Sequence, residues 1–114
     1  MKRANWGIGL FLLFFLTFDL SSYAQVITGD IFGTVTDQSG AAVPGASVTA
    51  TCVATNIGRT VKTDQAGNYR VANLPVCVHK VTVTAQGFKT EVGNADVQAG
   101  ITLKADFRLP VGQK

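Results

Sequence analysis

Apolar and polar residues alternate with a period of two along most of this chain, and this pattern limits the fold more than any other feature. In residues 101–109, five apolar residues fall on one face and four polar residues on the other. Such alternation is typical of a β-strand with one buried face. We expect about seven strands, at residues 30–36, 46–51, 60–63, 69–71, 80–84, 90–97 and 101–109. Because each strand is apolar on one side only, two sheets must pack face to face.

The composition after residue 24 agrees with an all-β chain. Thr and Val are abundant, and branched side chains of this kind suit a pleated sheet better than a helix. The aromatic residues in this part are few: Phe32, Tyr69, Phe88 and Phe107. No stretch has the period of an amphipathic helix, so we predict an all-β domain.

The first residues predict an export signal. Lys2 and Arg3 precede an apolar run at residues 7–18, and small residues at Ser22 and Ala24 suit cleavage after Ala24. We therefore expect a signal peptide at residues 1–24, a domain at residues 25–112 and a tail at residues 113–114.

An uncleaved membrane anchor is the alternative for the N-terminal segment. The apolar run is short for a span of about 20 residues, and Asp19 interrupts its end. We expect cleavage, and no membrane span after it.

The positive charge of the chain does not indicate a nucleic-acid partner. The formal net charge is +3, and part of it lies in the export signal. The remaining lysines, such as Lys62, Lys80 and Lys104, are scattered singly, without the basic run that nucleic-acid binding needs.

Two nearly identical pentapeptides, TDQSG at residues 36–40 and TDQAG at residues 63–67, predict turns. Asp37 and Asp64 take the first corner, where a carboxylate accepts backbone N–H groups two residues on. Gly40 and Gly67 take the fourth, where the backbone becomes left-handed. A calcium loop needs acidic residues at alternate positions and a closing Glu, which both pentapeptides lack.

Proline marks two further breaks in the pattern. Pro44 and Gly45 predict a second bend after the first pentapeptide. Pro75 is expected to end pairing at residues 73–75, because proline has no N–H group for the ladder.

Cys52 and Cys77 both fall in phase with the apolar faces of their strands. In an exported chain a pair of cysteines favours a disulfide; two buried free thiols are the alternative. His79, the only histidine, also lies on the inward phase, and a core histidine is expected there. Two Cys and one His lack the fourth ligand and the spacing of a zinc site, so no metal and no cofactor is expected.

Three blocks resemble the carboxypeptidase regulatory-like domain family: GTVTDQSGAAVPGASVTA at residues 33–50, TDQAGNYRVANLP at residues 63–75 and VTVTAQGF at residues 81–88. The resemblance covers about residues 29–110. It implies a seven-stranded Greek-key sandwich of the transthyretin-like, or carbohydrate-binding-like, type. The chain departs from the family pattern at Cys77, where the family has Gly, and at His79, where it has Tyr.

The resemblance also implies a context. Similar domains follow the signal peptide of Oar-like TonB-dependent outer-membrane receptors, and residues 109–112, LPVG, look like the phrase that leads into the receptor plug. This implies export to the periplasm or outer membrane of a Gram-negative-type bacterium, with receptor domains or another protein as partner.

No catalytic motif accompanies these features. The sequence has no zinc-peptidase signature, nucleophile elbow or phosphate-binding loop. We therefore predict a non-enzymatic structural or protein-interaction module. The alternative is a carbohydrate-binding module, for which Phe32 and Phe88 are the candidate ligand contacts, since sugars stack on exposed aromatic rings.

Overall fold

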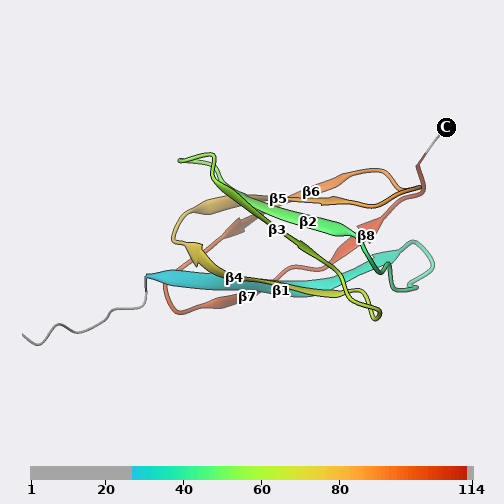
Figure 1. The fold of residues 1–114 in the computed structure, drawn as a ribbon, viewed down its shortest axis with the longest axis horizontal. Coiled ribbons are helices and arrows are strands. Elements are labelled where there is room, and N and C mark those ends of the chain that lie inside the picture. Colours follow the sequence, from blue (N-terminus) through green and yellow to red (C-terminus); the bar gives the residue numbers. More distant parts are fainter. Residues whose placement is uncertain (1–26, 113–114) are drawn as a thin grey trace, which may run out of the picture.

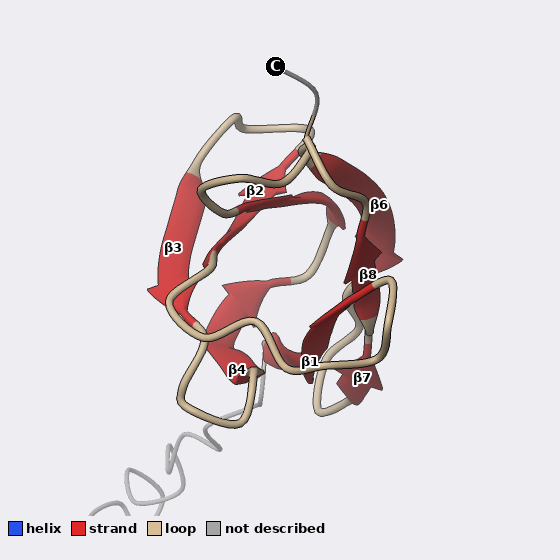
Figure 2. Ribbon diagram, turned by 90° about the vertical axis from the view of Figure 1, so that its right-hand side faces the viewer, coloured by secondary structure: helices blue, strands red, loops and turns tan. Residues whose placement is uncertain are grey.

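The computed structural model describes residues 27–112, which form two packed β-sheets and no helix. One, the β1 sheet, contains β4 (Asn68–Pro75), β1 (Thr28–Asp37), β7 (Thr102–Lys104) and β8 (Phe107–Leu109). The other, the β2 sheet, has the order β3 (Gly58–Lys62), β2 (Ser47–Cys52), β5 (Val78–Thr84) and β6 (Glu91–Asp96). Figures 1 and 2 show the two layers from the side and nearly along the strands. The predicted β-sandwich is confirmed.

The expected signal peptide, residues 1–24, lies outside the described residues. Within residues 27–112 the structure contains no helix that is long and apolar enough to cross a membrane.

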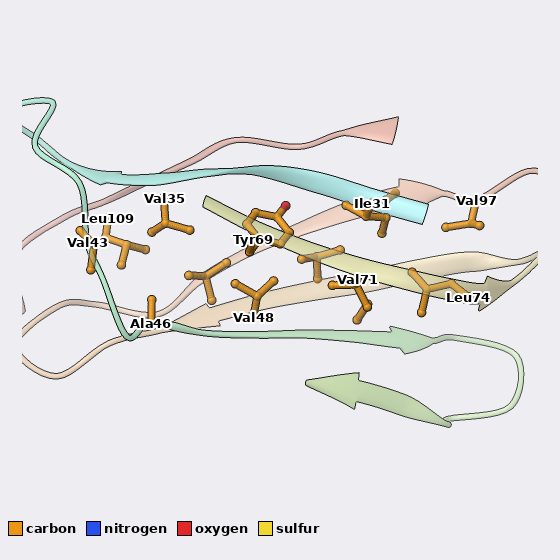
Figure 3. Close-up of a cluster of buried hydrophobic side chains, with 14 residues drawn as sticks. Ile31, Val35, Val43, Ala46, Val48, Tyr69, Val71, Leu74, Val97 and Leu109 are labelled. Atoms are coloured by element: carbon orange, nitrogen blue, oxygen red, sulfur yellow. The ribbon is translucent and has the colours of Figure 1, made fainter. Parts of the chain in front are cut away.

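The inward-facing residues of both sheets form one apolar core, as their alternation predicts (Figure 3). In β2 every second residue is buried, and in β5 His79, Val81 and Val83 alternate with more exposed residues. The core members are Ile31, Val35, Val43, Ala46, Val48, Ala50, Tyr69, Val71, Leu74, Val81, Val83, Ala95, Val97 and Leu109. Full burial of an aliphatic side chain contributes roughly 1.5–3 kcal/mol, so this cluster is the main source of stability.

The last predicted strand is divided in two, which makes eight strands in place of seven. Residues 101–109 keep their alternation, but the chain leaves the ladder at Ala105 and Asp106. The N–H of Ala105 donates to the Phe32 carbonyl, and the Asp106 carboxylate accepts the N–H of Thr34 at 2.9 Å. A side chain thus replaces a backbone acceptor, and β7 and β8 each pair in parallel with β1 on either side of this break.

The prediction that pairing stops at residues 73–75 is wrong. β4 continues to Pro75 because an extra residue is accommodated as a bulge: Val71 pairs with Ile31, and Leu74 pairs with Gly29. Asn73 adopts a left-handed φ of 59° there. Asn is among the residues that tolerate this conformation. Pro75 fits because β4 is an edge strand, where a missing N–H need not break a ladder.

At Gly33, the backbone of β1 comes very close to the segment at Ala105. Gly33 pairs with Tyr69 across the ladder, and the Tyr69 hydroxyl reaches over β1 to donate to the Ala105 carbonyl. A Cβ atom on Gly33 would collide with that same carbonyl oxygen. Burial, and to a smaller extent the Asp106 carboxylate, raises the pKa of Tyr69 above its ordinary value, so the hydroxyl remains a proton donor.

We expect Gly33→Ala to lower the free energy of unfolding by about 3 kcal/mol or more, because backbone atoms must shift to admit the methyl group. Gly93→Ala is the matched control. Its Cβ would meet only the Phe107 ring, at 3.1 Å, so a change below about 1 kcal/mol is expected. Urea unfolding followed by circular dichroism measures both, and equal losses would contradict the close approach.

Candidate interaction surfaces

The two pentapeptides form turns of the same geometry. The Asp37 carboxylate accepts the N–H groups of Ser39 and Ala41 at 2.9 and 3.0 Å, and the Asp64 carboxylate accepts those of Ala66 and Asn68 at 2.9 Å. The Ser39 hydroxyl and the Ala41 N–H are the main causes that lower the pKa of Asp37. Each carboxylate is therefore used to close its own turn.

The same turns lie next to each other at one end of the sandwich, to the right in Figure 1, but their glycines differ in environment. Gly40 and Gly67 have φ values of 90° and 79°. A Cβ on Gly40 would meet nothing within 4 Å, whereas a Cβ on Gly67 would lie 2.6 Å from the Val35 carbonyl oxygen. The second turn is thus packed against the strand that leads into the first.

A buried threonine, which the sequence analysis did not single out, joins the second turn to the bend at Pro44 and Gly45. The Thr63 hydroxyl donates to the Val43 carbonyl at 2.6 Å and accepts the Ala46 N–H at 2.9 Å. Gly45 has a φ of 72° and donates its N–H to the Thr63 carbonyl. Hydrogen bonds through Thr63 therefore join the start of the second turn to the bend at Pro44 and Gly45.

Cys52 and Cys77 are joined by a disulfide, with their Cα atoms 6.0 Å apart. Cys52 ends β2 and is buried, whereas Cys77 is half-buried in the short connection before β5. The bond ties the β2–β3 loop to the β4–β5 connection at the left end of Figure 1.

His79 packs beside this disulfide as a core residue. Its side chain is buried, and its Nδ1 lies 3.1 Å from the Cys77 carbonyl oxygen. The Cys77 sulfur lies 3.7 Å from the same nitrogen. His79 is almost fully buried, and no cluster of three metal-ligating side chains occurs among residues 27–112. His79 and the disulfide therefore fit a structural role better than a catalytic one.

We define the disulfide end of the sandwich as Ile27 and the loops 53–57, 76–77 and 97–101. Most of it is exposed and apolar, although Val97 is buried in the core and Cys77 is half-buried. Backbone hydrogen bonds place its parts side by side: Val53 to Val78, Val97 to Cys77, and Gly100 to Thr28. None of these loops contains a charged residue. Six large apolar side chains at or beside this end are 46–69% exposed: Ile27, Val53, Ile57, Val76, Val78 and Ile101. Large exposed apolar patches on soluble domains usually mark interaction sites.

The two candidate sugar-contact residues lie apart. Phe32 is 37% exposed on the outer face of the β1 sheet, between Arg70 and Lys104 on the neighbouring strands. Phe88 is half-buried against the core and lines a shallow pocket with Pro44 and Gln86, in which Phe32 takes no part. The structure therefore does not combine them into one binding surface.

The observed β-sandwich agrees with the family that the sequence matches. The family profile of the carboxypeptidase regulatory-like domain matches residues 30–110. The chain belongs to this family. The family domain is non-catalytic. No curated protein matches the sequence.

Solved structures show the fold alone, because their sequence identity is low. The Bacillus anthracis TIE protein has a TM-score of 0.63 at 18% identity, over 74% of this chain and 16% of that protein. A Streptococcal ancillary pilin has a TM-score of 0.61 at 16% identity, over 77% and 34%. The Acinetobacter radioresistens catechol 1,2-dioxygenase has a TM-score of 0.62 at 15% identity, over 78% and 53%. The chain thus spans about half or less of each of these proteins.

We expect reduction of the disulfide to lower the free energy of unfolding by about 3.5 kcal/mol, the chain-entropy value for a loop of this size. The loop has a sequence separation of 25 residues. Cys52→Ala/Cys77→Ala should show the same loss and no further response to reductant. Alkylation of two thiols in unreduced, denatured protein would contradict the bond.

We expect Gly67→Ala to destabilise the domain more than Gly40→Ala. Both changes put an alanine into a left-handed conformation, at a cost of roughly 1–2 kcal/mol. Only the change at Gly67 adds a contact with the Val35 carbonyl oxygen. Thermal unfolding of the two variants side by side measures the difference, and a larger loss for Gly40→Ala would contradict this packing.

Proposed function

We propose that this protein is an exported, non-catalytic β-sandwich that binds other proteins of the cell envelope. The disulfide end is the observation that carries the proposal. Its exposed aliphatic side chains and its lack of charge suit an apolar protein surface. A nucleic acid or an anionic bilayer would favour basic residues at such a surface.

The family membership favours a structural or binding role over catalysis, since the matching domain is non-catalytic. The buried polar groups support it too. Thr63 is hydrogen-bonded within a turn, and His79 contacts the disulfide and a backbone carbonyl. Neither is available to activate a nucleophile or a water molecule.

The cellular context that we propose is the N-terminal extension of a TonB-dependent outer-membrane receptor, or a relative of one. The apolar run at residues 7–18 supports export. The described chain enters at the disulfide end and leaves β8 at the opposite end (Figure 1). A receptor attached after residue 112 would therefore leave the disulfide end free for a partner.

A photoreactive amino acid at Ile57 should form a crosslink to an envelope protein in intact exporting cells, because this side chain is 67% exposed at the apolar end. The same amino acid at Gln65, an exposed position in the second turn, is the matched control and should give no such adduct.

Two further measurements complete this test. Val53→Asp should remove the Ile57 adduct and leave thermal stability unchanged, since Val53 is 63% exposed. The N-terminus of the exported protein should be Gln25. Equal crosslinking from both positions, or retention of the protein in the cytoplasm, would overturn the proposed function.

A further inference from the structure

We infer that copies of this domain associate side by side, with β3 of one copy pairing with β6 of the next. This rests on the proposed role as an interaction module and names one partner, a second copy of the chain. The surface involved is the pair of open edges of the β2 sheet, not the disulfide end.

β3 presents unpaired backbone groups to solvent. Ile57 accepts the N–H of Cys52, and Thr63 donates its N–H to the Ala46 carbonyl, so odd-numbered residues of this strand face β2. Hydrogen-bonding direction alternates along an antiparallel strand. The N–H and C=O groups of Gly58, Thr60 and Lys62 therefore point away from the sheet.

β6 presents the complementary edge. Val97 donates its N–H to the Cys77 carbonyl, and the register continues without a shift to Glu91. The outward groups are therefore those of Val92, Asn94 and Asp96. The Val92 side chain, 51% exposed on the outer face, remains uncovered in a single copy.

The edges of the other sheet are blocked by features that natural proteins use against edge pairing. β4 contains the bulge at Asn73 and ends at Pro75, and the Ala72 carbonyl already accepts a hydrogen bond from Arg59. β7 and β8 have three residues each and are separated by Asp106. Open edges of useful length thus remain only on β3 and β6 within residues 27–112.

The charges on the two edge strands favour pairing of β3 with β6 over pairing of either strand with its own copy. β3 carries Arg59 and Lys62 and no acidic residue, and β6 carries Glu91 and Asp96 and no basic residue. Like charges on facing strands are destabilising, and opposite charges are stabilising. Pairing of β3 with β3, or of β6 with β6, would bring like charges together.

Strand direction agrees with this choice. All neighbours in the four-stranded β2 sheet are antiparallel, so β3 and β6 run in opposite directions. A copy displaced sideways, without being turned over, places its β6 antiparallel to β3. Every copy then points its C-terminal end the same way, as attachment to receptors in one membrane requires. A two-fold β6 pair would point them in opposite directions.

One register between β3 and β6 of neighbouring copies extends the cross-strand rows that already run through the β2 sheet. Thr60, Thr49, Thr82 and Val92 lie opposite one another in a single row across the sheet. Thr60 of one copy then faces Val92 of the next, and Gly58 faces Asn94. The outward backbone groups of both strands meet in this register, and Val92 becomes covered.

Two proline variants test the inference, because each removes an outward N–H and blocks one edge. Sedimentation velocity of the exported protein should show assemblies that grow with concentration up to about 1 mM. Thr60→Pro alone and Asn94→Pro alone should remain monomeric. An equimolar mixture should form dimers and nothing larger, since each variant keeps the edge that the other lacks.

Circular dichroism controls for folding, and charge variants provide a second route if a proline variant does not fold. In this register Arg59 of one copy lies diagonally across from Glu91 of the next, on the same face. Arg59→Glu and Glu91→Arg should each weaken assembly of the protein with itself, and their mixture should associate more strongly than either alone. Assembly should also weaken as salt is added.

Several outcomes would overturn the inference: a wild-type protein that stays monomeric, dimers of Thr60→Pro alone, or assembly that survives both proline changes. Assembly lost in Val53→Asp but kept in the edge variants would assign self-association to the disulfide end instead. Crosslinking from Ile57 to another envelope protein would still support the proposed function in each of these cases, so the two failures are distinguishable.

Discussion

The inner faces of the two sheets bury one continuous apolar core, and the rest of the structure depends on keeping that core closed. Ile31 and Val35 from the middle strand of one sheet pack with Val48, Val81 and Val83 from the other. An apolar face that lost its partner would be exposed to water, so neither sheet is stable alone. The turns between the sheets and the disulfide hold the two layers together, and the close approach at Gly33 holds residues 105–106 against β1 within one sheet.

Side-chain hydrogen bonds hold the strands together both within one sheet and between the two. Tyr69 links β4 to the break between β7 and β8, and Arg59 links β3 to the bulge carbonyl of β4. On the outer face, the Asn73 N–H and the Arg70 guanidinium hold the pKa of Asp30 below its ordinary value, and this carboxylate fastens the bulge. Because these groups are committed to the scaffold, both proposals rest on surfaces: the uncharged apolar end and the two open edges of opposite charge.

The apolar disulfide end was not predicted from the sequence. The loops 53–57, 76–77 and 97–101 contain no charge, a signal available in the sequence once those loops are known to lie together. The roles of Asp37, Gly40, Asp64 and Gly67 followed from local turn chemistry, which depends on neighbours only a few residues away. Thr63 could not be assigned this way, because its partners Val43 and Ala46 are brought to it by the fold.

The sequence by itself determined that the chain is a sandwich, because a period of two over short segments leaves one apolar face on each strand and demands a second sheet. It also determined where the turns fall, since Asp and Gly act on their own backbone. Only the tertiary structure decided that residues 101–109 divide at Ala105, that β4 continues through a bulge to Pro75, and that Phe32 and Phe88 lie apart. These depend on contacts between segments distant in the chain. At Gly33, the space left by a missing side chain admits the Ala105 carbonyl from the break between β7 and β8, some seventy residues later.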